Sequence, residues 1–331
     1  MAFWGTLLLG LILAAWTRVL GGCWQRLRSG QRLIDHRPKP AVPWGGLDLA
    51  LSVFVIGLTL SLALRQLHNW YPALAEGAAT ATERLASLPA SDQLKAMLVS
   101  KSAELIGLAL VVGFTILRSG ANWSDFGFQG GPNWLDVRQA ARMFALMVVP
   151  VYGLMFVLQQ LAPKQYLTNV HPILQMLRDS PEPARLMGGI FVMAVILAPL
   201  SEELMFRVLL QSWFQNVDVA ARSRRLWLTT RRPFDVQAVT GNLRPSTGEG
   251  LDVEQNVPGI WPIASSSILF ALAHFGHALD PIPLFVLALG IGYLYARTGR
   301  YWPCVLMHMM NNGLSFVMMC AYLASGQLPT V

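Results

Sequence analysis

The chain has 331 residues, of which 54% are hydrophobic and 13% are charged, and its mean hydropathy is +0.45. Soluble globular proteins carry about 25% charged residues, so this composition excludes an ordinary soluble domain and indicates an integral membrane protein. The net charge of +7 comes from basic residues that cluster between apolar segments, which is typical of topology signals and not of a nucleic-acid-binding surface. Three cysteines in apolar settings predict no disulfide framework.

Eight apolar segments are predicted to be membrane helices. In chain order they cover about residues 3–22, 46–66, 96–117, 139–161, 185–214, 260–275, 282–298 and 303–324. The N-terminal segment lacks the positively charged start of a cleavable signal peptide, so we expect it to be retained as the first helix. The sequence therefore predicts an all-α, polytopic transmembrane bundle. We divide it into membrane helices of unassigned role, 1–184, and a core, 185–331, that carries a polar loop insertion at about 215–259.

Basic residues in alternate connections predict the orientation of the bundle, because cytoplasmic connections carry an excess of Lys and Arg. The four connections with this excess hold Arg26, Arg28, Arg32, Arg37 and Lys39; Arg118 and Arg138; Arg222, Arg224, Arg225, Arg231, Arg232 and Arg244; and Arg297 and Arg300. We expect these connections to face the cytoplasm and both termini to lie outside. The short, mixed segment 171–184 predicts an interfacial or re-entrant helix, and 215–259 predicts a surface loop or small hairpin.

Three charged residues interrupt the fifth apolar segment. Glu202 and Glu203 are adjacent, and Arg207 follows four positions after the second. A carboxylate at the centre of a membrane helix costs roughly 2.5–3.5 kcal/mol on insertion scales, so such residues are usually functional. Glu203 and Arg207 share a helix face and can pair, whereas Glu202 is rotated away from that face. The spacing predicts a neutralised structural pair and a second carboxylate in a polar cavity, where it could act as a general base toward water.

Two later spans carry further polar side chains. Phe270 and His274 lie on one face of the sixth span, and His308 and Asn312 lie on one face of the eighth. Imidazole and amide groups are unfavourable in contact with lipid, so we expect both faces to turn into the bundle. A carboxylate, two imidazoles and an amide match the needs of acyl hydrolysis by water, in which a base activates the water and donors hold the oxyanion.

Plainer interpretations stay open for these residues taken alone. Each could make an interhelical hydrogen bond or belong to an ion-pair network. A proton- or ion-coupled transporter would use the glutamates and His274 as a relay, and it predicts an inverted repeat that the sequence does not show. A catalytically silent scaffold would bind a membrane partner through the 215–259 loop. Lys101 and Glu104, near one end of the third span, are interpreted as a snorkelling pair.

Taken in order, the polar positions form three motifs. They read Glu202-Glu203-Leu-Met-Phe-Arg207, Phe270-Ala-Leu-Ala-His274 and His308-Met-Met-Asn-Asn312. Together they resemble the CPBP family of intramembrane proteases, which includes CAAX prenyl endopeptidases and many bacterial homologues labelled Abi proteins. The likeness covers roughly residues 185–315. The connection 215–259 makes the separation between the first and second motifs longer than is usual in the family.

The resemblance implies a membrane-embedded endopeptidase that hydrolyses a peptide bond in a membrane-associated or lipidated substrate. It also implies a multi-pass protein of the cytoplasmic membrane of a bacterium. The candidate catalytic residues are Glu202, Glu203, Arg207, His274, His308 and Asn312. Prenylation of the substrate is not assumed, because many bacterial relatives meet no prenylated protein.

The family pattern also assigns roles to these residues. By the resemblance, Glu202 and His274 activate the water, and His308 and Asn312 form the oxyanion site. Glu202, His274 and His308 could supply the three protein ligands of a catalytic Zn²⁺. A metal-free glutamate mechanism uses the same residues, and the sequence does not choose between the two.

The predicted topology leaves one geometric difficulty. His274 is expected near the outer end of its span, and His308 near the inner end of its own span. The two imidazoles can meet only if a helix is broken or re-entrant, and Pro262 and Pro303 are the residues that would allow this.

Overall fold

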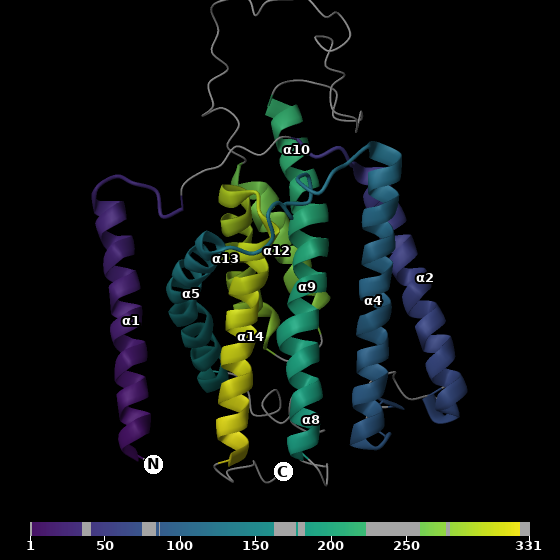
Figure 1. Ribbon diagram of the computed structural model, residues 1–331, viewed down its shortest axis with the longest axis horizontal. Helices are drawn as coiled ribbons and strands as arrows, with labels where there is room; N and C mark the ends of the chain where they lie inside the picture. Colours follow the sequence, from purple (N-terminus) through teal and green to yellow (C-terminus); the bar gives the residue numbers. More distant parts are fainter. Residues whose placement is uncertain are drawn as a thin grey trace, which may run out of the picture.

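A computed structural model describes residues 2–34, 41–74, 84–85, 87–161, 177, 183–222, 259–275 and 279–324. Within these ranges the regular structure is helical and contains no strand. The elements are α1 (Ala2–Arg28), α2 (Gly46–Trp70), η1 (Pro72–Leu74), α4 (Ala90–Ser119), α5 (Trp134–Leu161), α8 (Pro183–Ile190), η2 (Phe191–Leu197), α9 (Ala198–Glu203), η3 (Leu204–Gln211), α10 (Ser212–Arg222), α12 (Ile260–Ala273), α13 (Pro281–Thr298) and α14 (Tyr301–Ala324). The predicted all-α bundle is confirmed (Figure 1).

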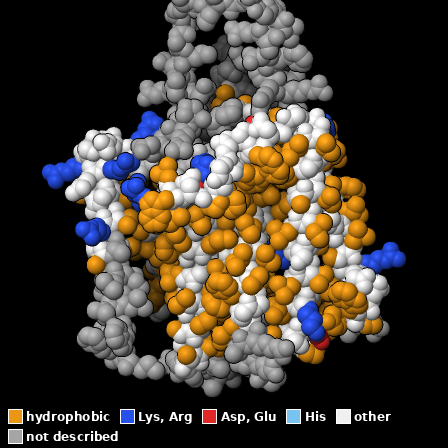
Figure 2. All heavy atoms as spheres, viewed as in Figure 1, with side chains coloured by type: hydrophobic (Ala, Val, Ile, Leu, Met, Phe, Trp, Pro, Cys, Tyr) orange, Lys and Arg blue, Asp and Glu red, His pale blue; other side chains and the backbone are white. Residues whose placement is uncertain are grey.

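Six helices of the described residues are long and apolar enough to cross a membrane: α2, α4, α5, the continuous helix from α8 to α10, α13 and α14. Apolar side chains such as Leu58, Phe114 and Phe156 are exposed on the outside of the bundle. Figure 2 shows that apolar side chains cover most of the visible described surface. A surface of this kind is stable in lipid and unfavourable in water, so the chain is an integral membrane protein.

The helices pack in pairs around one large buried apolar cluster and three smaller ones among the described residues. Helix α2 packs along α4, α12 packs along α13, and α5 packs against both α13 and α14. Gly107 of α4 allows the first of these contacts, because a Cβ there would lie 2.6 Å from the Thr59 hydroxyl and 3.1 Å from the Ile56 Cα. Helix α4 also touches α8, η2 and α9. The N-terminal helices therefore reach the segment that carries Glu202.

The helix that carries the two glutamates is longer than the sequence predicts. It continues through α10 to Arg222, so the expectation that a loop begins at 215 is wrong. Contacts with the start of α2 and the segment before it explain the extra turns: the Asn216 amide donates to the Val42 carbonyl at 2.8 Å, and the Trp213 ring packs on Gly46, the first residue of α2. The rest of the predicted loop, 223–258, lies outside the described residues, as does nearly all of the predicted interfacial helix at 171–184.

Helix α12 ends inside the bundle. It has 14 residues, which gives a length of about 21 Å, shorter than the hydrocarbon core of a bilayer at about 30 Å. His274, directly after its last residue, is therefore held at depth and not at an outer surface. Of the two predicted alternatives, a broken or a re-entrant helix, the prolines do not produce the first: Pro262 and Pro303 lie in the first turns of α12 and α14, where no intrahelical hydrogen bond is lost.

Several Lys and Arg side chains of the described residues lie near the upper end of the bundle in the space-filling view (Figure 2), which has the orientation of Figure 1. The C-terminal ends of α1, α4 and α10 lie there, and the first residue of α1 and the last turn of α14 lie at the opposite end. Several of these arginines are structural as well. Arg118 pairs with Asp48 at 2.6 Å, and Arg300 pairs with Asp136 at 2.7 Å. The arrangement agrees with the predicted orientation, whose assignment to the cytoplasm stays a prediction.

Candidate active site

Glu202 and Glu203 end a short α-helical segment between two π-helical segments. Helix α9 covers Ala198–Glu203, and η2 and η3 flank it. π-Helical turns are rare in proteins, and those that occur are often found at functional sites. The Tyr301 hydroxyl donates to the Leu200 carbonyl at 2.7 Å and fixes α9 against α14. The two glutamates therefore sit on a backbone that is held from a neighbouring helix.

The backbone of η2 explains one partner of Asn312. Pro199 has no N–H, so it cannot donate to the carbonyl of Ala194, five residues earlier, as a π-helix requires. The Asn312 side-chain amide donates to this carbonyl instead, at 2.9 Å. The Asn311 amide donates in turn to the Asn312 oxygen at 3.3 Å. Asn312 thus belongs to the support of the Glu202 helix, and its predicted place at the oxyanion stays a prediction.

The predicted pair between Glu203 and Arg207 is present and fully buried. The Arg207 Nε donates to the Glu203 carboxylate at 3.1 Å, and both side chains are 0% exposed. The other Glu203 oxygen accepts from Nδ1 of His308 at 2.7 Å. Arg207 also donates to the Ser266 hydroxyl at 3.1 Å, and its guanidinium lies over the Phe270 ring. Each of these contacts offsets part of the cost of burying the charges.

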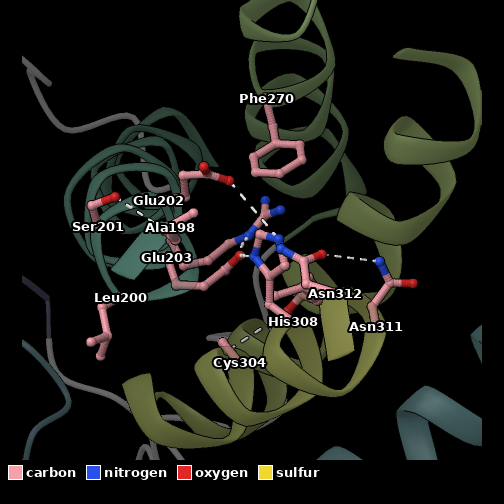
Figure 3. A network of polar contacts seen from close by, with 12 residues as sticks. Ala198, Leu200, Ser201, Glu202, Glu203, Phe270, Cys304, His308, Asn311 and Asn312 are labelled. Atoms are coloured by element: carbon pink, nitrogen blue, oxygen red, sulfur yellow. Dashed lines mark hydrogen bonds and ion pairs between the residues drawn. The ribbon is translucent and has the colours of Figure 1, made fainter. Parts of the chain in front are cut away.

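Glu202 faces a different set of groups, as Figure 3 shows in part. One of its oxygens lies 3.9 Å from Nε2 of His274 and 3.9 Å from Nε2 of His308. The other oxygen lies 3.8 Å from the Lys101 ammonium. The Glu202 side chain keeps 15% of its surface exposed, unlike Glu203. Four helical segments (α4, α9, the end of α12 and α14) thus bring their polar groups to one carboxylate.

Both imidazoles are held at Nδ1 by an acceptor. Nδ1 of His274 lies 2.9 Å from the Phe270 carbonyl, and Nδ1 of His308 lies against the Glu203 carboxylate. Both Nδ1 atoms therefore carry a proton. The Nε2 atoms of both rings face the Glu202 oxygen at a distance too long for a direct hydrogen bond.

The spacing fits a bridging water. A molecule at about 2.8 Å from two acceptors spans about 3.9 Å when the angle at its oxygen is about 90°, which a water can accept. Its two protons would point at Glu202 and one imidazole. The group thus has the arrangement of a general-base site.

The donor types suit zinc, but their spacing does not. Two ligands of a tetrahedral zinc site lie about 3.4 Å apart, and the Glu202 oxygen lies 3.9 Å from each imidazole nitrogen. Among the described residues, no group of three His, Cys, Asp or Glu side chains is close enough to hold a metal ion. We therefore derive no step through a metal. The predicted zinc site of Glu202, His274 and His308 stays a prediction.

Lys101 is the residue that sequence reasoning missed. It pairs with Glu104 at 2.8 Å, as expected, but the pair does not snorkel to an interface. The ammonium also donates to the Ser201 hydroxyl at 3.3 Å, and the side chain is only 18% exposed. The expectation failed because α4 begins at Ala90 and not near 96, which puts both charges close to the middle of the helix. A pair of charges so deep in a membrane helix was the signal.

Residues 185–314 match a family model, described as Rce1-like: type II CAAX prenyl endopeptidase Rce1-like. The resemblance to CAAX prenyl endopeptidases is therefore confirmed over this segment, which contains all six candidate residues and less than half of the chain. Lys101 and Glu104 lie outside it. No curated protein and no solved structure matches the chain. The family match supports membrane endopeptidase activity and a peptide or protein substrate.

Proposed function

We propose that the chain is a membrane-embedded endopeptidase in which Glu202 activates the attacking water. The observation that carries this proposal is the position of the Glu202 carboxylate, 3.9 Å from the Nε2 atoms of both His274 and His308. A metal-free water-activation chemistry accounts for all three groups. The match of residues 185–314 to CAAX prenyl endopeptidases supports the same reaction class.

The reaction would proceed through two proton transfers. Glu202 takes a proton from the bridging water, and the oxygen attacks the scissile carbonyl carbon to give a tetrahedral intermediate. The C–N bond then breaks as Glu202 returns the proton to the leaving amine. His274, whose Nδ1 is held by the Phe270 carbonyl, accepts the second water hydrogen bond at Nε2 and orients the water.

His308 would stabilise the oxyanion in its doubly protonated form. A neutral ring bound to Glu203 through Nδ1 has no donor at Nε2, whereas an imidazolium does. The buried Glu203 carboxylate, 2.7 Å from Nδ1, would neutralise the charge of this cation. Asn312 donates one amide hydrogen to the Ala194 carbonyl, and its second hydrogen would donate to the oxyanion.

The substrate would be a peptide segment that enters the bilayer or carries a lipid anchor. The site lies among apolar helices, so an extended or lipidated segment reaches it more readily than a folded domain does. The partly exposed side chains of Glu202 and His274 supply the access that hydrolysis requires. The predicted location in a bacterial cytoplasmic membrane is part of this proposal.

Cleavage of a peptide library by the purified protein in detergent tests the proposal. The wild type should release new N-termini that mass spectrometry identifies, and His274→Ala should lose the activity. His68→Ala is the matched control, because His68 is exposed and lies on α2, a helix that carries none of the candidate site residues. Full activity in both Glu202→Ala and His274→Ala would overturn the mechanism.

Metal analysis of the active preparation tests the zinc prediction: one zinc per chain, lost in His308→Ala, would support it.

A further inference from the structure

A cavity between α1 and α5 carries positive charge that the proposed reaction does not use. Its volume is about 890 Å³, and its lining includes Arg18, Arg26, Arg142, Gly22 and Cys23. None of the described residues that line it is acidic. Three guanidinium groups around one cavity repel one another, so the cavity favours an anion.

The cavity lies at the arginine-rich end of the bundle. Its lining comes mostly from the C-terminal half of α1 and the residues just after it, with Arg142 from the N-terminal half of α5. Both helix halves point to the upper end in Figure 1. Figure 2 shows several Lys and Arg side chains gathered over the upper part of α1. Basic residues toward one end of a membrane bundle are attracted to anionic lipid head groups.

The arginines are positioned differently within the cavity. The Arg26 guanidinium donates to the carbonyls of Arg32 and Leu33, at 3.2 and 3.5 Å, and is held in place by them. No described carboxylate pairs with Arg18 or Arg142, from α1 and α5 respectively. Guanidinium groups bind phosphate through two parallel hydrogen bonds, which makes these two residues suited to a phosphate anion.

The attachment of α1 to the bundle leaves room for such a ligand. The Trp16 indole donates to the Ala145 carbonyl of α5 at 2.9 Å, one turn from Arg142, and α5 is the main neighbour of α1 among the described elements. A Cβ placed on Gly21 or Gly22 would meet nothing within 4 Å. The helices are thus joined at Trp16 and separated beside the arginines.

We propose that this cavity binds a phosphate anion, and that its source is the head group of an anionic membrane lipid. The lipid would bridge Arg18 of α1 and Arg142 of α5, with its acyl chains along the apolar outer face. The proposal is independent of the proteolytic function. It explains why a helix with few protein neighbours carries arginines toward the adjacent helix.

Lipid retention by the purified full chain tests the proposal. Native mass spectrometry in detergent should detect one bound phosphatidylglycerol per chain and no comparable retention of phosphatidylcholine. Each of Arg18→Gln and Arg142→Gln should weaken the retention about fivefold, from the usual contribution of one arginine near an anionic lipid. Arg28→Gln is the control, because Arg28 is on the same end of α1 and does not line the cavity. Equal loss in the control would overturn the site.

A second pair of variants tests the cavity by volume. Gly22→Leu fills open space in the cavity and should displace the lipid, whereas Gly153→Leu fills open space on α5 away from the cavity and should not. Inorganic phosphate separates the two sources of the anion. If inorganic phosphate at millimolar concentration displaces all of the bound phosphatidylglycerol, the assignment to a lipid is overturned. If phosphatidylglycerol and phosphatidylcholine are retained alike, the phosphate site is overturned.

Discussion

The Lys101 ammonium lies 3.8 Å from the Glu202 carboxylate, although Lys101 belongs to α4 and lies outside the segment that matches the protease family. It also pairs with Glu104, at 2.8 Å, so one cation serves two carboxylates. The ammonium attracts the Glu202 carboxylate and holds it where it would act as a general base. Lys101 is therefore expected to act as a positioning residue for Glu202.

Lys101→Met tests this role. The variant keeps the length of the side chain and removes its charge, so Glu202 loses the cation 3.8 Å away and stays beside Glu104. We expect kcat to fall by about tenfold or more, because the carboxylate is no longer held in place. The double variant Lys101→Met with Glu104→Gln should recover part of the rate, because it also removes the second carboxylate. A double variant no faster than Lys101→Met would indicate a purely structural lysine.

Glu203→Gln should destabilise the protein strongly. The change leaves the fully buried Arg207 without its carboxylate, and the one amide oxygen of glutamine cannot replace both oxygens that accept from Arg207 and from His308 Nδ1. Removing one partner of a buried ion pair costs about 3–5 kcal/mol. A thermal-shift measurement in detergent should show a large fall in Tm for Glu203→Gln and a small one for Glu202→Gln, whose carboxylate is partly exposed. Equal Tm values for the two variants would contradict the assignment of Glu203 to a structural ion pair and of Glu202 to catalysis.

The effects of substitutions at Asn312 and Pro199 on stability should depend on each other. Asn312→Ala leaves the Ala194 carbonyl without its donor, at a cost of about 1–3 kcal/mol for an unsatisfied buried group. Pro199→Ala restores an N–H five residues after Ala194, so Asn312→Ala should cost less in that background. A double-mutant cycle on Tm measures this difference. Strict additivity would mean that Asn312 does not compensate for the proline.

Segment 223–258 should be removable without unfolding the rest of the protein. Asp218 accepts from the Gly259 N–H at 2.7 Å and from the Trp261 indole at 2.6 Å, which brings the two ends of segment 223–258 together. Replacing 223–258 by a short Gly-Ser linker should therefore keep the Tm within a few degrees. Asp218→Ala should lower the Tm, because it removes both bonds. If the wild type folds and the linker variant does not, the two ends that flank 223–258 are not held together by Asp218 alone.

Helical spacing predicted the part of the site that lies on single helices. The four-residue separation of Glu203 and Arg207 gave their pairing, and the rotation between Glu202 and Glu203 gave their different surroundings. The meeting of His274 with His308 was harder to predict, although the expected range 260–275 was already too short to cross a bilayer. That shortness removes the conflict in depth that the predicted topology left open.

Contacts between distant helices could not be predicted from one sequence. The approach of Lys101 to Glu202 depends on the start of α4 and on its packing against α9, neither of which has a local signal. The support of the Ala194 carbonyl by Asn312 depends on the π-helical turns of η2, which sequence patterns do not mark. Both contacts arise from tertiary packing, which overrides the patterns that single helices carry.

The most direct test of the account is the rate of peptide hydrolysis by Glu202→Gln, measured as kcat/KM on a substrate that the wild type cleaves, with the Tm of both proteins recorded. The account predicts a folded variant whose rate is lower by about a hundredfold or more, because a glutamine cannot take a proton from water. A folded Glu202→Gln that cleaves the substrate at the wild-type rate would contradict it.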